Sequence, residues 1–248
     1  MSLPTTSAPW AMAEYAGARQ AELDTLCAQV EFPVAGTLLD IQAAGGFVAD
    51  AIAERSGGRI HCVCVEPSAE LRARLAPRHT IYADEIDNLE SVADNSIDIA
   101  LGLAGLHHSP SARGTLAEVW RVLVPGGQLG LCDVAPDSAV ARWLNEFVNE
   151  HNPTGHDGCF LDQAAIEALL RDTGYTDIRA SVESVPWRFD GDADLLRFFS
   201  GLFGLRCEAG TIARGIEQYL SIDRSHGRVE VGWELIYVHA AKPRRPNA

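Results

Sequence analysis

The chain has 248 residues, 47% of them hydrophobic and 22% charged, with 20 Lys and Arg side chains against 34 Asp and Glu side chains. This composition excludes a disordered or fibrous protein and is that of an ordinary globular chain, large enough for one domain with a small lid. The net charge of -14 repels phosphate backbones and anionic membranes, so neither nucleic acid nor a membrane is an expected partner.

Helical and strand-like patterns alternate along the first part of the chain. In chain order they predict a leading helix within 10–30, a strand at 37–41, a helix at 47–55, a strand at 60–65, a helix at 68–76, a strand at 79–82, a short helix at 86–92 and a strand at 97–101. Strand, helix and strand at this spacing form a βαβ unit with a right-handed crossover. We therefore expect a parallel sheet.

The second part of the chain continues with helices and strands of similar length. The pattern predicts a helix at 111–123, a strand at 128–134, helices at 138–150 and 162–173, a strand at 177–185, helices at 192–204 and 210–220, and a final strand at 229–240. The loop at 151–158 is rich in turn-forming residues and is a candidate lid. The basic run of Lys242, Arg244 and Arg245 is interpreted as a solvated tail.

Two acidic residues follow neighbouring strands of the first βαβ unit. Asp40 stands near the end of the first strand, and Glu66 follows the second strand, 20 positions after Gly46. An acid at this distance from a glycine-bearing turn can accept hydrogen bonds from a ribose hydroxyl pair. The alternative is that Glu66 is a solvated residue at a strand end.

Six ordered segments carry a family resemblance. They are TLLDIQAAGG at 37–46, CVEPS at 64–68, YADE at 82–85, NSIDIA at 95–100, LHH at 106–108 and AEVWRVLVPGG at 117–127. Together they resemble the class I S-adenosylmethionine-dependent methyltransferases, especially the small-molecule group that includes the ubiquinone and menaquinone methyltransferases. The resemblance spans roughly residues 35 to 135.

This resemblance implies an α/β fold of the Rossmann-like methyltransferase type. Its sheet would have seven mostly parallel strands with an antiparallel last strand, and a C-terminal helical and lid insertion. The expected organisation is a helical lead-in at 1–34, a cofactor-binding core at 35–135, and substrate-side helices, lid loop and closing strands of the same domain at 136–248.

The resemblance also implies the cofactor S-adenosyl-L-methionine, with S-adenosyl-L-homocysteine as product, and methyl transfer to an oxygen, nitrogen or carbon atom of a small molecule. Glu66 with Asp84 or Glu85 would hold the adenosine, and Asp40 and the Gln42 carbonyl would lie near the cofactor ammonium. The full set of implied cofactor-binding residues is Asp40, Gln42, Ala44, Gly46, Glu66, Asp84, Glu85 and Leu103.

The glycine turn departs from the family pattern. The family carries glycine at three positions of this turn, which here are Gln42, Ala44 and Gly46. Glycine suits such a turn because it adopts unusual dihedrals and lets the backbone approach a ligand. One interpretation is that Gln42 points aside and the cofactor still binds. The other is a protein that has lost methyl transfer and serves as a partner-binding or regulatory subunit, or uses the cofactor for another reaction such as cyclisation.

His107 and His108 follow the fourth strand, where the methyl donor is expected. Histidine is suited to deprotonate a hydroxyl or an amine near neutral pH, so both are candidate catalytic residues. Because neighbouring strand residues point to opposite faces, we expect only one of them to face the crevice. The alternative is that one packs in the core and the other caps the following turn.

The candidate lid carries further residues of interest. His151, His156, Asp157 and Cys159 are close in sequence, but they lack the paired clusters typical of zinc sites, so no metal is expected. A substrate-facing role for His156 is the preferred interpretation.

Aromatic residues are frequent in the C-terminal third. Their spacing is most simply explained by core packing. Trp187 and Phe199 are nevertheless candidates to line an apolar substrate pocket, because small-molecule sites are concave and mostly apolar.

The six cysteines are too sparse for a disulfide scaffold. The beginning of the chain lacks a signal-peptide pattern, and no apolar stretch is long enough to span a bilayer. We therefore expect a cytoplasmic protein with a small-molecule substrate. The sequence leaves open a homo-oligomer or a protein partner.

Overall fold

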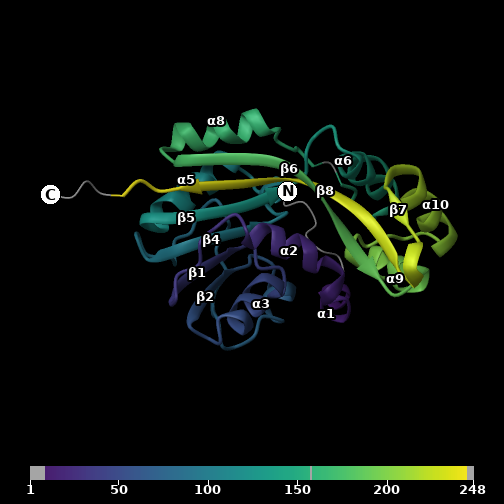
Figure 1. Ribbon diagram of the computed structural model, residues 1–248, viewed down its shortest axis with the longest axis horizontal. Coiled ribbons are helices and arrows are strands. Elements are labelled where there is room, and N and C mark those ends of the chain that lie inside the picture. Colours follow the sequence, from purple (N-terminus) through teal and green to yellow (C-terminus); the bar gives the residue numbers. More distant parts are fainter. Residues whose placement is uncertain (1–8, 157, 245–248) are drawn as a thin grey trace.

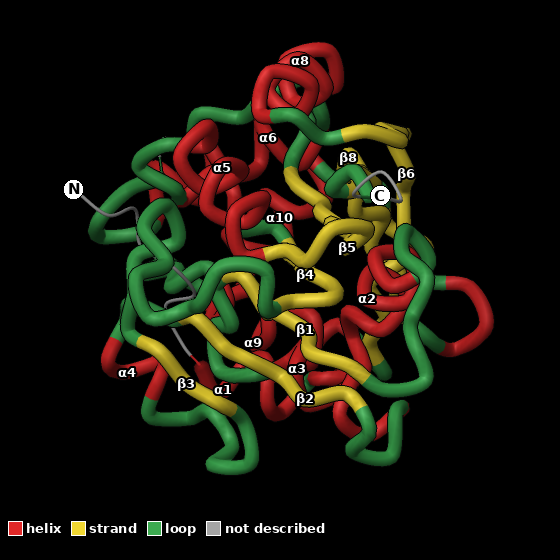
Figure 2. Tube along the Cα trace, turned by 90° about the vertical axis from the view of Figure 1, so that its left-hand side faces the viewer, coloured by secondary structure: helices red, strands yellow, loops and turns green. Residues whose placement is uncertain are grey.

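The computed structural model describes residues 9–156 and 158–244, which fold around one mixed sheet (Figure 1). Its strand order is β3-β2-β1-β4-β5-β8-β6, and a short strand β7 pairs with β8. Figure 2 shows the strands following one another in this order through a twisted sheet. Strand β8 is antiparallel to both of its long neighbours, whereas β1 to β5 run parallel. The predicted fold class is therefore confirmed.

The first half of the structure contains the parallel βαβ units. Its elements are α1 (Pro9–Glu14), a 3-10 turn η1 (Ala16–Arg19), α2 (Gln20–Cys27), β1 (Gly36–Ile41), α3 (Phe47–Arg55), β2 (Ile60–Val65), α4 (Ala69–Arg72), β3 (Thr80–Tyr82) and β4 (Ile97–Leu103). The registers align the carboxyl ends of β1, β2 and β4 at one edge of the sheet.

The second half closes the sheet and adds a helical insertion. Its elements are η2 (Leu106–His108), α5 (Ala112–Val122), β5 (Leu123–Asp133), α6 (Ala139–Arg142), the π-helical turn η3 (Trp143–Val148), α7 (Asn149–His151), α8 (Gln163–Thr173), β6 (Thr176–Phe189), α9 (Asp192–Leu202), α10 (Ala209–Tyr219), β7 (Ile222–Asp223), η4 (Ser225–Gly227) and β8 (Val229–Ala241).

Helices cover both faces of the sheet, and each face has its own apolar core. On one face Leu23 and Leu26 of α2 and Ile52 of α3 join a cluster that continues into the C-terminal insertion. On the other face α5 and α8 pack with β4 and β5, and Val119 and Leu170 are fully buried there. Figure 1 shows α5 and α8 on one side of the sheet and α2 and α3 on the other.

Helices α9 and α10 are inserted between β6 and β8, which extend beyond the parallel strands to meet them. Their core consists of rings that pack edge to face or stacked. The rings of Trp187 and Trp233 stack with centroids 3.9 Å apart, and Phe199 contacts both. Helix α1 packs so closely on α9 that a Cβ at Gly201 would lie 2.6 Å from the ring of Trp10.

One predicted element is wrong. Residues 86–92 form turns rather than a short helix. The backbone amide of Leu89 donates to the Glu118 carboxylate, and its carbonyl accepts from Arg121. These side chains of α5 satisfy the polar backbone groups that a helix would otherwise pair internally.

Among the described residues, no helix combines the length and the apolar character that crossing a membrane requires.

Candidate active site

The turns after β1, β2, β4 and β5 meet at the carboxyl edge of the sheet. The chain reverses its strand order between β1 and β4, and in open α/β sheets such a switch point forms the ligand crevice. Gln42 follows β1, Glu66 follows β2, Ala104 follows β4, and Asp133 ends β5.

The turn after β1 keeps the backbone conformation that glycine usually supplies. The φ angles of Gln42 and Ala44 are 65° and 46°, and those of Gly45 and Gly46 are 106° and 98°. The turn is held by the amide of Ala43, which donates to the Val65 carbonyl at 2.9 Å. The two substituted positions therefore keep the turn but hold a left-handed conformation that disfavours side chains.

Glu66 is completely buried, so it is not a solvated strand-end residue. Its carboxylate accepts from the amides of Ala44 and Ser68, each at 2.8 Å. Burial raises the pKa of this carboxyl, and the two amide donors oppose that rise. Glu66 thus joins the turn after β1 to the start of α4.

Asp40 is the second buried acid of the crevice. Its carboxylate accepts from the amide of Ala49 in the first turns of α3, at 3.1 Å. Burial, with smaller contributions from Glu66 and Asp50, raises the pKa of Asp40 from 3.8 to about 7. The carboxyl therefore sits where an added positive charge would stabilise its ionised form.

A first cavity of about 80 Å³ lies beside this turn. Its lining residues are Met12, Arg19, Asp40, Gln42, Ala43, Ala44, Phe47, Val48, Leu103, Ala104 and His108. The Gln42 side chain reaches Gly105, and its amide oxygen occupies the space where Gly105 would carry a Cβ. That oxygen is buried and has no hydrogen-bond partner among the described residues.

The predicted adenosine-side residues lie outside this cavity. Asp84 accepts from both the amide and the hydroxyl of Ser91, at 2.7 and 2.8 Å, and so stabilises its own turn. Glu85 is exposed on the same turn. The structure therefore places Asp40, Gln42, Ala44 and Leu103 together, and places Asp84 and Glu85 apart from them.

His107 forms a buried pair with Asp133, a residue that the sequence did not single out. The ring Nδ1 lies 2.5 Å from Asp133 Oδ1, and the His107 backbone amide donates to Oδ2 at 2.8 Å. The side chains are 5% and 6% exposed. The amide of Val134 also donates to Asp133 Oδ1, at 2.7 Å. The histidine ring is thus fixed from β5.

His108 lies beside His107 in the 3-10 turn η2 rather than in β4, so the strand alternation does not apply. The prediction that only one of the two faces the crevice is wrong, because both line the same cavity. Their ring centroids are 4.0 Å apart. Burial, followed by His107 and His156, holds the pKa of His108 well below its usual value. Its buried Nδ1 has no partner among the described residues.

A second cavity of about 100 Å³ adjoins the histidines. Its lining residues are Arg19, Ala104, His107, His108, Val134, Leu144, His156, Trp187, Leu202, Phe203 and Trp233. Arg19, Ala104 and His108 line both cavities. Trp187 and His156, which the sequence predicts as substrate contacts, both line this cavity. Phe199 is buried in the aromatic core and does not line this cavity, so the packing alternative describes its place.

His156 reaches the cavity because the helix before it holds its loop. Asn145 Oδ1 lies 3.1 Å from His156 Nδ1 and accepts from the Gly158 amide at 3.0 Å. Asn149 accepts from the His156 amide at 2.8 Å. Asn145 lies in the π-helical turn η3, and such turns often mark functional sites.

The other lid residues do not converge with His156. His151 packs against Phe147, and Cys159 is exposed. Asp157 lies outside the described residues, as does Arg245 of the basic tail. Within the described part of the chain, no group of three or more His, Cys, Asp or Glu side chains is arranged to hold a metal ion.

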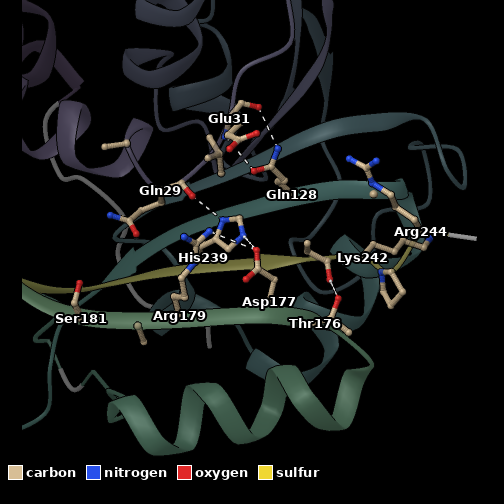
Figure 3. A pocket seen from close by; sticks show the side chains of 16 residues that line it. Gln29, Glu31, Gln128, Thr176, Asp177, Arg179, Ser181, His239, Lys242 and Arg244 are labelled. Atoms are coloured by element: carbon tan, nitrogen blue, oxygen red, sulfur yellow. Dashed lines mark hydrogen bonds and ion pairs between the residues drawn. The ribbon is translucent and has the colours of Figure 1, made fainter.

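A larger groove of about 610 Å³ lies at the opposite edge of the sheet, where β5 begins (Figure 3). His239 lies at its floor, with Nδ1 2.6 Å from the Gln29 carbonyl and Nε2 3.2 Å from Asp177. The Gln128 amide side chain pairs with both backbone groups of Glu31. All of these hydrogen-bonded residues line the groove itself. The groove is at the opposite edge of the sheet from the turns that form the crevice.

Comparisons with known proteins agree with the fold. Residues 39–131 match the family described as a methyltransferase domain. An arsenite methyltransferase of Halobacterium salinarum is 23% identical over 64% of this chain, and the chain spans 42% of that protein's length. The YcgJ protein of Bacillus subtilis has a TM-score of 0.64 at 17% identity, over 90% of this chain and 98% of that one. A phosphoethanolamine N-methyltransferase of Haemonchus contortus, in complex with phosphomonomethylethanolamine and S-adenosylhomocysteine, has a TM-score of 0.64 at 16% identity, over 91% and 53%.

The fold is that of the Rossmann-like methyltransferase structures. The match to the methyltransferase domain covers residues 39–131 of the 248-residue chain.

Proposed function

We propose that the protein transfers a methyl group from S-adenosylmethionine to an oxygen, nitrogen or carbon atom of a small molecule, and releases S-adenosylhomocysteine. The observation that carries this proposal is the pair of adjoining cavities, one beside the turn after β1 and one beside the His107–Asp133 pair. A donor and an acceptor held next to each other react with much of the entropic barrier already removed.

The residues of the first cavity fit the amino-acid end of this cofactor. Asp40 is a buried acid that an ammonium group would stabilise, and Gln42 offers a buried amide oxygen with no partner in the described chain. Buried polar atoms without partners are rare in proteins and call for a ligand or water. Asp40, Gln42 and Leu103 would hold this end of the cofactor.

The adenosine end would meet Glu66 and the turn that carries Asp84 and Glu85. Glu66 is completely buried and already accepts two backbone amides, so ribose hydroxyls would have to reach its remaining lone pairs. When bound, the cofactor supplies a methyl group already activated by the sulfonium, and the protein aligns an acceptor with it.

His107 is the residue placed to remove a proton from the acceptor. The Asp133 carboxylate can only accept, so the His107 Nδ1 must carry the hydrogen that they share. Nε2 is then the basic nitrogen of the ring. General-base catalysis by such a residue contributes about 10²–10⁴-fold in rate.

Calorimetric titration with S-adenosylmethionine and S-adenosylhomocysteine tests the cofactor part of the proposal. We expect binding of both, and we expect Glu66→Ala to weaken it at least about ten-fold, which corresponds to about 1.4 kcal/mol. Glu70→Ala is the matched control, because Glu70 is exposed on the neighbouring α4. Circular dichroism shows whether each variant is folded. Absence of binding by the folded wild-type protein at millimolar ligand would favour a partner-binding protein instead.

A further inference from the structure

The walls of the second cavity are formed mainly by rings and branched aliphatic side chains. Trp187 and Trp233 stack on each other, and Phe203 stacks against Trp233 with centroids 5.9 Å apart. Val134 and Leu144 are both buried beside them. A dry cavity of about 150 Å³ accommodates benzene, so a cavity of about 100 Å³ suits one small ring after slight adjustment. The size and the ring-rich lining favour a single ring with a polar substituent.

Among the described residues that line this cavity, Arg19 is the permanently cationic one, and the protein itself neutralises it. Arg19 makes two hydrogen bonds of 2.6 Å to the carboxylate of Glu22, which is 0% exposed. The Trp187 Nε1 donates to the same carboxylate at 2.8 Å, and the Arg19 guanidinium lies over the Trp187 ring, 4.9 Å from its centroid. An anionic ligand would therefore have to displace a buried bidentate ion pair, which is costly.

The described lining of this cavity contains no carboxylate, and the two acids that contact lining residues from behind are already paired. Asp133 accepts from the His107 ring, from the His107 amide and from Val134. Glu22 is occupied by Arg19 and Trp187. An ammonium group placed in this cavity would lose its hydration without gaining a carboxylate partner. The cavity is thus built for an uncharged ligand with one polar group near the histidines.

We propose that the methyl acceptor is a small, uncharged aromatic hydroxyl compound of the phenol type, whose ring packs against Trp187 and Trp233 and whose hydroxyl faces His107. This inference rests on the proposed methyl transfer and names its substrate class. The His107 Nε2 takes the hydroxyl proton while an oxygen electron pair forms the new oxygen–methyl bond and the carbon–sulfur pair stays on sulfur. The proton then passes from His107 to water, and the products are an aryl methyl ether and S-adenosylhomocysteine.

Glu22 is the residue that sets this preference for an uncharged ring, through Arg19. Replacing it with Gln keeps the shape and removes the negative charge, which leaves the guanidinium beside the cavity without its counter-charge. Glu14 provides a matched control, because it is an exposed acid of the neighbouring α1 that pairs with Arg197.

The test compares three probes of similar size, phenol, benzoate and benzylammonium, by calorimetry with the full-length protein, each with and without S-adenosylhomocysteine. We expect phenol to bind at least ten-fold more tightly than either charged probe. We expect Glu22→Gln to change the ratio of benzoate affinity to phenol affinity at least ten-fold in favour of benzoate. We expect Glu14→Gln to leave this ratio unchanged. If Glu22→Gln does not fold, the relative affinities of the wild-type protein for phenol and the two charged probes test the substrate class.

Equal affinity for the three probes, tighter binding of a charged probe, or binding of none of them would overturn the assignment of the substrate class. The separate titration with S-adenosylhomocysteine reports on the proposed function. Cofactor binding without a preference for phenol refutes the substrate class alone, whereas failure of the cofactor to bind refutes methyl transfer.

Discussion

Replacing Ala44 with Gly should stabilise the protein, because Ala44 holds a backbone conformation that residues with a Cβ avoid. Its φ is 46°, and the left-handed conformation costs about 1–2 kcal/mol for such residues. Glycine removes this cost, but its more flexible unfolded chain offsets about 0.4–1 kcal/mol. The net gain, about 0.5–1 kcal/mol of unfolding free energy, corresponds to a rise in Tm of about 1–4 °C for a chain of this size.

Thermal and urea denaturation followed by circular dichroism measure this change. The substitution keeps the backbone amide that donates to Glu66, so the turn loses no hydrogen bond. Ala53→Gly is the matched control, because residue 53 lies inside α3 and should lose about 1 kcal/mol there. If Ala44→Gly destabilised the protein as much as Ala53→Gly does, the reasoning about the left-handed turn would be refuted.

Three further predictions concern the buried acids. The folded-state pKa of Asp40, about 7, lies above its ordinary value of 3.8, so the wild-type protein should lose stability as the pH rises from 4 to 7. Asp40→Asn should reduce this loss, measured as the difference in unfolding free energy between pH 5 and pH 8 in urea denaturation. An unchanged difference would contradict the prediction. Asp133→Asn should lower kcat by about 10²–10⁴-fold with the affinity for S-adenosylhomocysteine unchanged, since Asp133 contacts His107 and Val134 and does not line the first cavity. A parallel loss of that affinity would point to a structural role instead. Glu66→Gln should cost about 1–3 kcal/mol of unfolding free energy, because one of its two backbone amide donors would then face an NH₂ group. The control Glu70→Gln should leave the unfolding free energy unchanged. Equal stability of the two variants would exclude the role of Glu66 in joining the turn to α4.

The alternation of strands and helices was predictable because it depends on local periodicity. The strand that contains Asp40 and the helix after Gly46 are marked by apolar runs, glycines and spacing, which a single sequence displays directly. The segment at 86–92 was misassigned because its backbone is paired by side chains of α5, which no local pattern reveals. The organisation into three segments stays a prediction.

The candidate site was predictable only in part, because several of its contacts join distant segments. Asp133 ends an apolar strand 26 positions after His107, and no local sequence pattern around Asp133 indicates that it pairs with this histidine. Arg19 lies in the leading segment, yet it reaches both cavities from there. His107 and His108 share a cavity because they lie in a 3-10 turn, where strand alternation does not hold. The roles of these residues in binding and catalysis stay predictions.

Hydrogen exchange in the presence of S-adenosylhomocysteine is the measurement that tests the central claim most directly, since it reports both binding and its place. We predict slower exchange for the amides of residues 42–49 and 104–108, which surround the two adjoining cavities, with no change in the groove around His239. Protection elsewhere, or none at millimolar ligand, would contradict methyl transfer in this crevice.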